Sequence, residues 1–205
     1  MDFSDLKIRA KKSLSGHWKD TLIVLIVFGV LTGITSTFNI GNEPSNTEVA
    51  VAGLLSLVGL VITCLLGFGY INYFLKLSRD EKSDYRELFS KTNLAVDYFV
   101  IALLVGIFTF LWSLLFIIPG IIAAIRYSQA FYIKLDNPDL NAIECIDKSK
   151  ELMKNHKMDY FLLVLSFIGW AILGVFTLFI LYFWLVPYYA TTLCNFYNKI
   201  KDEKK

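Results

Sequence analysis

Long apolar runs dominate the pattern of hydrophobic and polar positions along the chain. Four stretches contain no Asp, Glu, Lys or Arg: residues 21–42, 49–75, 98–125 and 160–198. The shortest run has 22 residues and the longest has 39. A bilayer core of roughly 30 Å is crossed by about 20 helical residues that rise about 1.5 Å each. The pattern therefore predicts an all-α fold, a polytopic membrane helix bundle.

Basic residues mark four segments outside these runs. They are Lys7, Arg9, Lys11, Lys12 and Lys19 at the start; Lys76, Arg79, Lys82, Arg86 and Lys91 in the middle; Lys134, Lys148, Lys150, Lys154 and Lys157 later; and Lys199, Lys201, Lys204 and Lys205 at the end. Segments rich in Lys and Arg stay in the cytoplasm of a membrane protein. Residues 39–48 contain neither and are expected outside.

The charge distribution predicts the number of spans. If all four basic segments are cytoplasmic, the chain crosses the membrane an even number of times between each consecutive pair. Regions 97–134 and 160–198 must then each turn once. Pro119 can open the first returning helix, because proline is tolerated in a first helical turn. We expect the second turn at or before the aromatic cluster at 182–184.

This interpretation gives six spans, arranged as three hairpins, with the N- and C-termini both in the cytoplasm. The alternative is four spans, with long kinked helices over 97–134 and 160–198. Such helices of about 38 residues would be about 57 Å long, nearly twice the bilayer core. The basic N-terminus could suggest a signal peptide, but the run that follows is too long for one. We expect it to be retained as the first span.

A short amphipathic stretch precedes each predicted hairpin, at residues 3–14, at 83–91, and from Asn137 to about Met153. Apolar stripes with basic flanks are typical of helices that lie in the membrane interface. In the third stretch, Asn137 and Pro138 form a suitable N-cap and first helical position.

After each amphipathic stretch, an aspartate stands at the start of the next predicted span: Asp20, Asp97 and Asp159. The pattern suggests three repeats, 1–78, 79–135 and 136–201, within a single integral membrane domain, 1–205. Another explanation for the aspartates alone is their favourable interaction with a helix N-terminus.

Composition agrees with a membrane protein and excludes several other classes. The chain is 56% apolar, with a mean hydropathy of +0.55. Its three cysteines, Cys64, Cys145 and Cys194, are far apart and form no CxxC pair, which argues against a disulfide framework or a metal knuckle. His17 and His156 have no third ligand nearby in sequence, so we expect no metal and no cofactor.

Several segments resemble a bacterial integral membrane family known as domain of unknown function 975. The resemblance lies at residues 6–18, at 116–130 with the following Asp136-Asn137-Pro138, at 149–156, at 165–170, and at Pro187-Tyr188. It covers nearly the whole chain, and its most specific part is the Pro119-Gly120 to Arg126-Tyr127 segment. The resemblance implies a membrane protein and supplies no activity.

Arg126 is the most informative single residue, because the six-span interpretation places it near the bilayer midplane. Charges at that depth are costly and usually face the bundle interior or a cavity. Gln129 and Asn72 are among the polar side chains that could lie beside it. One interpretation is a lipid or anion contact formed by Arg126, Gln129 and Asn72, since guanidinium binds phosphate bidentately. The other is a structural arginine that pins a helix break or reaches the interface.

The sequence contains no known catalytic motif such as HExxH, GxSxG or a P-loop. We therefore expect a non-enzymatic protein of the cell membrane with no catalytic residues. It would handle a lipid or amphipathic small molecule, or act as an envelope accessory. Two alternatives stay open: an intramembrane lipid-modifying enzyme, and a structural or immunity-type partner of another membrane protein. Expected partners are membrane lipids, with another membrane protein as a further candidate and no nucleic acid; the sequence does not predict the oligomeric state.

Overall fold

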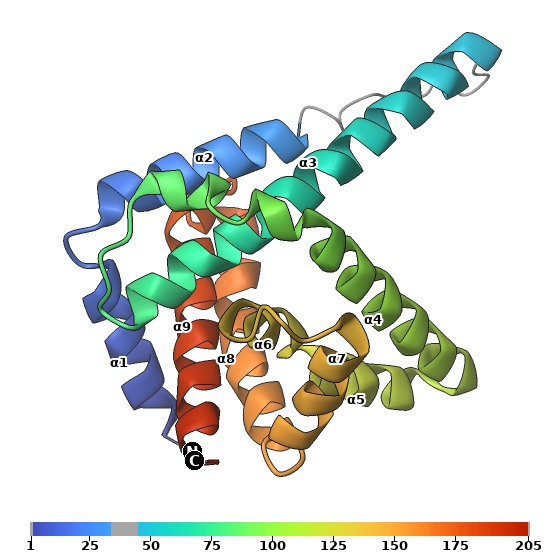
Figure 1. The fold of residues 1–205 in the computed structure, drawn as a ribbon. Helices are drawn as coiled ribbons and strands as arrows, with labels where there is room; N and C mark the ends of the chain where they lie inside the picture. The colour runs from blue at the N-terminus through green and yellow to red at the C-terminus, as the bar shows by residue number, and fades with distance from the viewer. Residues whose placement is uncertain (1, 34–44, 205) are drawn as a thin grey trace.

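The computed structural model describes residues 2–33 and 45–204, and within these ranges all regular secondary structure is helical (Figure 1). This confirms the predicted all-α class. The helices are α1 (Phe3–Leu14), α2 (Trp18–Gly33), α3 (Asn46–Ser78), α4 (Ala95–Leu115), α5 (Ile117–Tyr127), α6 (Ala130–Asp136), α7 (Ala142–Leu152), α8 (Lys157–Phe176) and α9 (Tyr182–Asp202), with short 3-10 helices η2 (Tyr85–Phe89) and η3 (Thr92–Leu94) between α3 and α4. The predicted outside segment at 39–48 lies largely outside the described residues.

Helices α2 and α3 form the first of three antiparallel pairs. The ring of Phe28 stacks on that of Tyr70 at 4.7 Å between centroids. The hydroxyls of Thr21 and Tyr73 form a hydrogen bond of 2.9 Å. Because the residue contacted on α3 moves backwards as the chain advances along α2, the two helices run in opposite directions. The chain therefore returns here, as the two separate apolar runs predict.

The second pair, α4 and α5, turns at Phe116. This residue is extended, with φ −161° and ψ 155°, and separates the two helices. Ser113 contacts Gly120 across the turn, and Phe108 lies 6.0 Å from Tyr127 between ring centroids. Pro119 lies in the first turn of α5, as predicted. The alternative of one long kinked helix over 97–134 is therefore wrong, because α4 and α5 lie side by side.

The third pair, α8 and α9, turns through residues 177–181. The Tyr182 hydroxyl donates to the carbonyl of Ala171 at 2.9 Å, and the Trp170 and Trp184 rings lie 6.2 Å apart. Leu178 and Phe179 have φ of 50° and 66°, a left-handed conformation that costs about 1–2 kcal/mol per residue. The turn lies just before Tyr182, where the sequence predicts it.

Both turns just described are apolar and have their backbone hydrogen bonds formed locally. The NH of Phe116 donates to Trp112, and the NH of Gly120 donates to Phe116. In the other turn the NH of Phe179 donates to Gly174, and the NH of Ile180 donates to Thr177.

A short helical segment precedes each pair, as predicted. Helix α1 precedes α2 with a bend of 94° between them, η2 precedes α4, and α7 precedes α8. The predicted start of the third segment at Asn137 is wrong. Helix α7 begins at Ala142, because Asn141 and Glu144 form a reciprocal capping box.

Only part of the predicted membrane topology is matched by helix length and composition. Three stretches are long and apolar enough to cross a bilayer: Asn46–Ser78, Tyr85–Leu115 and Lys157–Phe176. The bent pair α1 and α2 would make a fourth. Helix α2 has 16 residues, α5 has 11, and α9 is polar in its second half. The count of six spans therefore stays a prediction.

Helix α9 lies at the centre of the molecule, with α1 beside it (Figure 1). Phe196, Tyr197 and Ile200 are almost fully buried on α9, and Leu6 and Ala10 are buried on α1. The Asn195 side chain donates to the carbonyl of Leu6 at 3.2 Å. As a result, the two ends of the described chain lie next to each other, and polar groups from distant segments meet there.

Candidate functional site

Asp136 is the centre of a polar cluster that joins α3, α6 and α9. Its carboxylate accepts two hydrogen bonds from the Arg79 guanidinium, at 2.9 and 2.8 Å. Tyr197 donates to the same carboxylate at 2.9 Å, and Lys201 donates at 2.5 Å. Asn198 extends the cluster, because its oxygen accepts from Arg79 and its amide donates to Ser78. Helices from the first and third antiparallel pairs are thus tied to α6 and to each other.

The local structure explains why these groups converge. Arg79 follows the last residue of α3, so its side chain leaves the helix end. Asp136 is the last residue of α6, where Asn137 ends the helix. Tyr197 and Lys201 are four residues apart on α9 and therefore share one helix face. Each donor reaches Asp136 from a regular helix or its end, which fixes the geometry of the cluster.

The electrostatic environment holds Asp136 in its charged form. Burial alone would raise the pKa of its carboxyl group, because desolvation disfavours the charge. The hydrogen bonds from Arg79 and Lys201, the Arg79 charge and the Tyr197 hydroxyl oppose this and lower the pKa to about 2. Asp136 is therefore an ion-pair anchor, and it is poorly suited to act as a proton donor near neutral pH.

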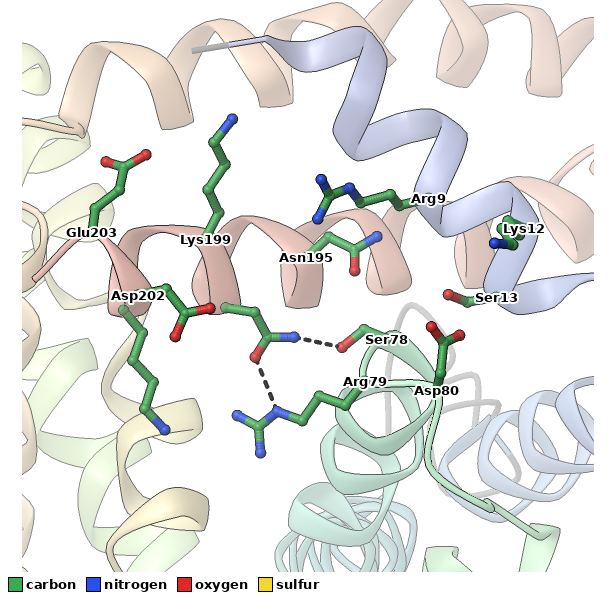
Figure 2. A pocket seen from close by; sticks show the side chains of 12 residues that line it. Arg9, Lys12, Ser13, Ser78, Arg79, Asp80, Asn195, Lys199, Asp202 and Glu203 are labelled. Carbon is green, nitrogen blue, oxygen red and sulfur yellow. Dashed lines mark hydrogen bonds between the residues drawn. The ribbon is translucent and has the colours of Figure 1, made fainter. Parts of the chain in front are cut away.

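A broad basin opens beside this cluster, with a volume of about 990 Å³. It lies between α1, the end of α3 and the last turns of α9 (Figure 2). The lining residues are Arg9, Lys12, Ser13, Ser78, Arg79, Asp80, Asn195, Asn198, Lys199, Lys201, Asp202 and Glu203. In Figure 2, Arg9 and Lys12 face the basin from α1, and Arg79 and Asp80 face it from the opposite side.

The basin is lined by charges of both signs, with a small excess of cations. Its lining contains five cationic side chains and three carboxylates, and Asp136 behind the lining adds a fourth carboxylate. Arg79 and Lys201 are committed to Asp136. Arg9 pairs with Asp5 at 3.0 Å, but both side chains are exposed, and such pairs contribute little. Arg9, Lys12 and Lys199 are therefore the cations that a ligand could recruit most easily.

Asn72, one of the predicted contact residues, lies in a different polar group. Its amide donates to the Glu87 carboxylate at 2.9 Å and to the Ser90 hydroxyl at 3.3 Å. Lys76 pairs with the same carboxylate at 2.6 Å. These contacts attach the η2 segment to α3, so the side chain of Asn72 has a structural role here.

Arg126 and Gln129 lie at the break between α5 and α6, next to α7. The Ser149 hydroxyl of α7 donates to the Arg126 carbonyl at 2.7 Å and accepts from the Gln129 backbone NH at 3.2 Å. The Gln129 side chain is buried and donates to Ser128. Its carbonyl oxygen has no hydrogen-bond partner among the described residues. The backbone at the break is thus satisfied by Ser149, and the residue Arg126 is half-buried.

The predicted trio is therefore not assembled by direct contacts. Arg126 and Gln129 share the Ser149 site, whereas Asn72 is held by Glu87. The sequence interpretation also missed the Asp136 cluster and the basin. The only signal for them was the presence of Arg79, Asp136 and Lys201 in segments predicted to share the cytoplasmic side.

A second buried ion pair fastens α4 to α6. The Lys134 ammonium is almost fully buried, pairs with Asp97 at 2.8 Å, and donates to the carbonyls of Pro138 and Leu140. All three donor hydrogens of the ammonium are therefore used. This group has no capacity left for a ligand.

Within the described ranges, no group of three or more His, Cys, Asp or Glu side chains is arranged so that it could hold a metal ion. His156 lies 3.5 Å from Asp159 and 3.6 Å from Glu203, which links α8 to the end of α9. His17 has a buried Nδ1 without a hydrogen-bond partner among the described residues. The two histidines are in separate places.

Comparison with known proteins gives one match. The model of the family described as "Protein of unknown function (DUF975)" matches residues 1–125 and 114–204. No curated protein and no solved structure matches the chain. The two family matches together cover nearly the whole chain. The chain therefore belongs to the DUF975 family of proteins of unknown function.

Proposed function

We propose that this protein is a non-catalytic, multi-pass protein of the plasma membrane that binds the phosphate headgroup of an anionic lipid. The binding site is the basin between α1, α3 and α9. The observation that carries the proposal is the excess of cationic side chains around a volume of about 990 Å³. Ligand sites commonly have volumes of about 300–1,000 Å³.

The chemistry of the available cations favours phosphate. Arg9 offers a planar guanidinium that can bind two phosphate oxygens at once. Lys12 and Lys199 add point charges from α1 and α9. Each Lys or Arg near a membrane surface contributes about 1 kcal/mol to the attraction of anionic lipid. Among the described lining residues there is no His or Cys, so we favour binding over catalysis.

Six spans, with both termini in the cytoplasm, complete the proposal. The four basic segments expected in the cytoplasm meet in one place: Arg9 belongs to the first, Arg79 to the second, Asp136 neighbours Lys134 in the third, and Lys201 belongs to the fourth. Segments on opposite sides of a membrane could not make these contacts. An even number of crossings between consecutive segments satisfies this condition.

The test is binding of a short-chain phosphatidylglycerol to the full chain in detergent, measured by a fluorescence or thermophoretic titration. The triple variant Arg9→Gln, Lys12→Gln, Lys199→Gln should bind at least about ten-fold more weakly, because three cations are removed. The matched control is Lys82→Gln, Lys148→Gln, Lys154→Gln, which removes equal charge from exposed sites outside the basin. It should bind like the parent.

Two further measurements complete this test. Affinity should fall as salt rises, since exposed charges are screened over about 10 Å at 0.1 M. Competition by soluble glycerol phosphate distinguishes the ligand source: if it displaces the lipid at equal concentration, the site recognises a soluble phosphate compound. Equal affinities of the two triple variants would disprove a basin site.

A further inference from the structure

A second feature, separate from the basin, lies between α8 and α9. It is a groove of about 250 Å³ whose lining is almost wholly apolar. Its lining residues are Val164, Phe167, Ile168 and Ala171 of α8, and Tyr182, Leu185, Val186 and Tyr189 of α9. Helix α8 is one of the stretches long and apolar enough to cross a bilayer. The groove is therefore on a helix pair that lipid chains are expected to surround.

A cation lies beside one of the residues that line this groove. The Lys7 ammonium is 4.6 Å from the centroid of the Phe167 ring, which lines the groove. Helix α1 packs on α9 with Leu6 and Ala10 buried. Lys7 lies on one flank of this buried face, and the basin residues Arg9 and Lys12 lie on the other flank. The basin and the groove are thus separate sites on the two sides of α1.

We propose that the α8–α9 groove holds one acyl chain of an anionic phospholipid, with the lipid phosphate placed at Lys7. The apolar lining accepts a hydrocarbon chain and no polar ligand. Because lipid tails are as apolar as the lining, the chain gains dispersion contacts rather than a hydrophobic driving force. Selectivity therefore comes from the headgroup, through Lys7.

The contact with a single lysine sets the size of the expected preference for anionic lipid. One Lys near the membrane surface gives about a five-fold preference for an anionic over a zwitterionic lipid. The native tryptophans are outside the groove, since neither Trp170 nor Trp184 is among its lining residues. Tyr189 does line the groove, so a tryptophan at this position can report on a chain that occupies it.

The experiment uses the full chain with its four tryptophans replaced by phenylalanine and with Tyr189→Trp as the reporter in the groove, reconstituted in phosphatidylcholine vesicles. Phosphatidylglycerol or phosphatidylcholine with brominated chains is added in increasing proportion, and quenching of this reporter is measured. We expect half-maximal quenching at an about five-fold lower fraction of the anionic lipid. Both headgroups contain a phosphate and differ in net charge, so Lys7→Gln should make the two lipids equal mainly by weakening the anionic curve.

Filling the groove tests the chain site directly. Ala171→Phe should remove most of the quenching and the preference, and Val186→Phe should do the same from the α9 side. The matched control is Ala124→Phe, at an exposed position of α5 away from the groove. If both groove-filling variants are quenched like the parent, or if the parent does not distinguish the two lipids, the proposal is wrong. The basin triple variant should leave quenching unchanged, so the groove and the basin can fail separately.

Discussion

At the scale of single residues, Asp136 receives donors that are far away in the sequence. Arg79 is 57 residues from it and Lys201 is 65 residues from it. A partly buried carboxylate with three charged or hydroxyl donors is stabilising as long as every partner is present. Removing the anion leaves Arg79, whose side chain is only 28% exposed, without its counter-ion.

Asp136→Asn should therefore destabilise the protein by about 3 kcal/mol, as for other broken buried pairs. The measurement is the apparent melting temperature in a fixed detergent. Asp147→Asn is the control, because Asp147 forms an exposed i,i+3 pair with Lys150. The control should change stability by no more than about 0.5 kcal/mol. Equal effects of the two substitutions would show that the cluster does not hold the helices together.

The lowered pKa of Asp136 gives a dependence of stability on pH. The folded-state pKa is about 2 and the ordinary value is 3.8, so the unfolded state takes up the proton first as the pH falls. The stabilisation is complete above pH about 4 and is lost as the pH drops towards about 2. It amounts to about 2 kcal/mol.

The check is the melting temperature of the parent and of Asp136→Asn between pH 2 and pH 6. The difference between them should be constant above pH 5 and shrink below pH 4. A difference that stays the same down to pH 2 would contradict the assignment.

Contacts between individual polar residues are the part of the structure that the sequence predicted least. Asp136 stands in a segment with several charged residues, and nothing in its spacing indicates that Arg79 and Lys201 are its partners. Arg126 stood out because its charge ends an apolar run. In the structure, however, it is the Arg126 backbone carbonyl that accepts a hydrogen bond from the Ser149 hydroxyl. Pairing between distant polar residues depends on how helices pack, which a linear pattern does not contain.

At the scale of elements, the close approach of α3 to η2 depends on one glycine. A Cβ atom on Gly69 would overlap the backbone carbonyl of Leu88, which is itself buried. A backbone atom cannot move aside as a flexible side chain can. Gly69 therefore lets η2 lie directly against α3, and this brings Glu87 within reach of Asn72 and Lys76.

Gly69→Ala should destabilise the protein by about 1–3 kcal/mol, the usual cost of overpacking. Gly53→Ala is the control on the same helix, because a Cβ there meets no other atom within 4 Å. The control should be neutral or slightly stabilising, since Ala is the better helix former. The measurement is the apparent melting temperature of both variants and the parent in the same detergent. A neutral Gly69→Ala would mean that η2 does not pack against α3 in this way.

The elements themselves were predicted well where charge and turn chemistry agree. The turn before Tyr182 and the position of Pro119 follow from the requirement that basic segments share one side. The start of α7 was placed too early, because Asn137-Pro138 and Asn141 with Glu144 both have the form of a helix start. The side-chain contacts of the capping box, which only the fold reveals, select the second.

At the scale of the whole molecule, residues from the four basic segments meet at the basin and the Asp136 cluster, and the large apolar surfaces lie on other helices. The exposed apolar side chains are concentrated on the first half of α3, on α4, on the start of α5 and on α8. This separation is what a membrane protein needs, because apolar surface faces lipid and charge faces water.

Six spans with cytoplasmic ends predict a specific labelling pattern. Single cysteines placed at Lys82, Lys154 and Lys204 should react with a membrane-impermeant maleimide only after the cytoplasmic side is opened. A cysteine at Glu43 should react in intact cells. The parent chain, whose Cys145 and Cys194 are buried, gives the background. Labelling of the Lys204 position from outside would disprove the topology.

The two apolar turns have a consequence for what the cell exterior can detect. Phe116 and Leu178 lie at the tips of their hairpins, are 75% and 82% exposed, and have some of the neighbouring backbone hydrogen bonds made within the turn. Such short apolar tips suit the boundary between lipid and water and carry no long polar loop. In the proposed six-span topology, an antibody or protease outside the cell would therefore depend on the segment expected there, residues 39–48, and a partner that recognises this protein through its basic groups would approach from the cytoplasm.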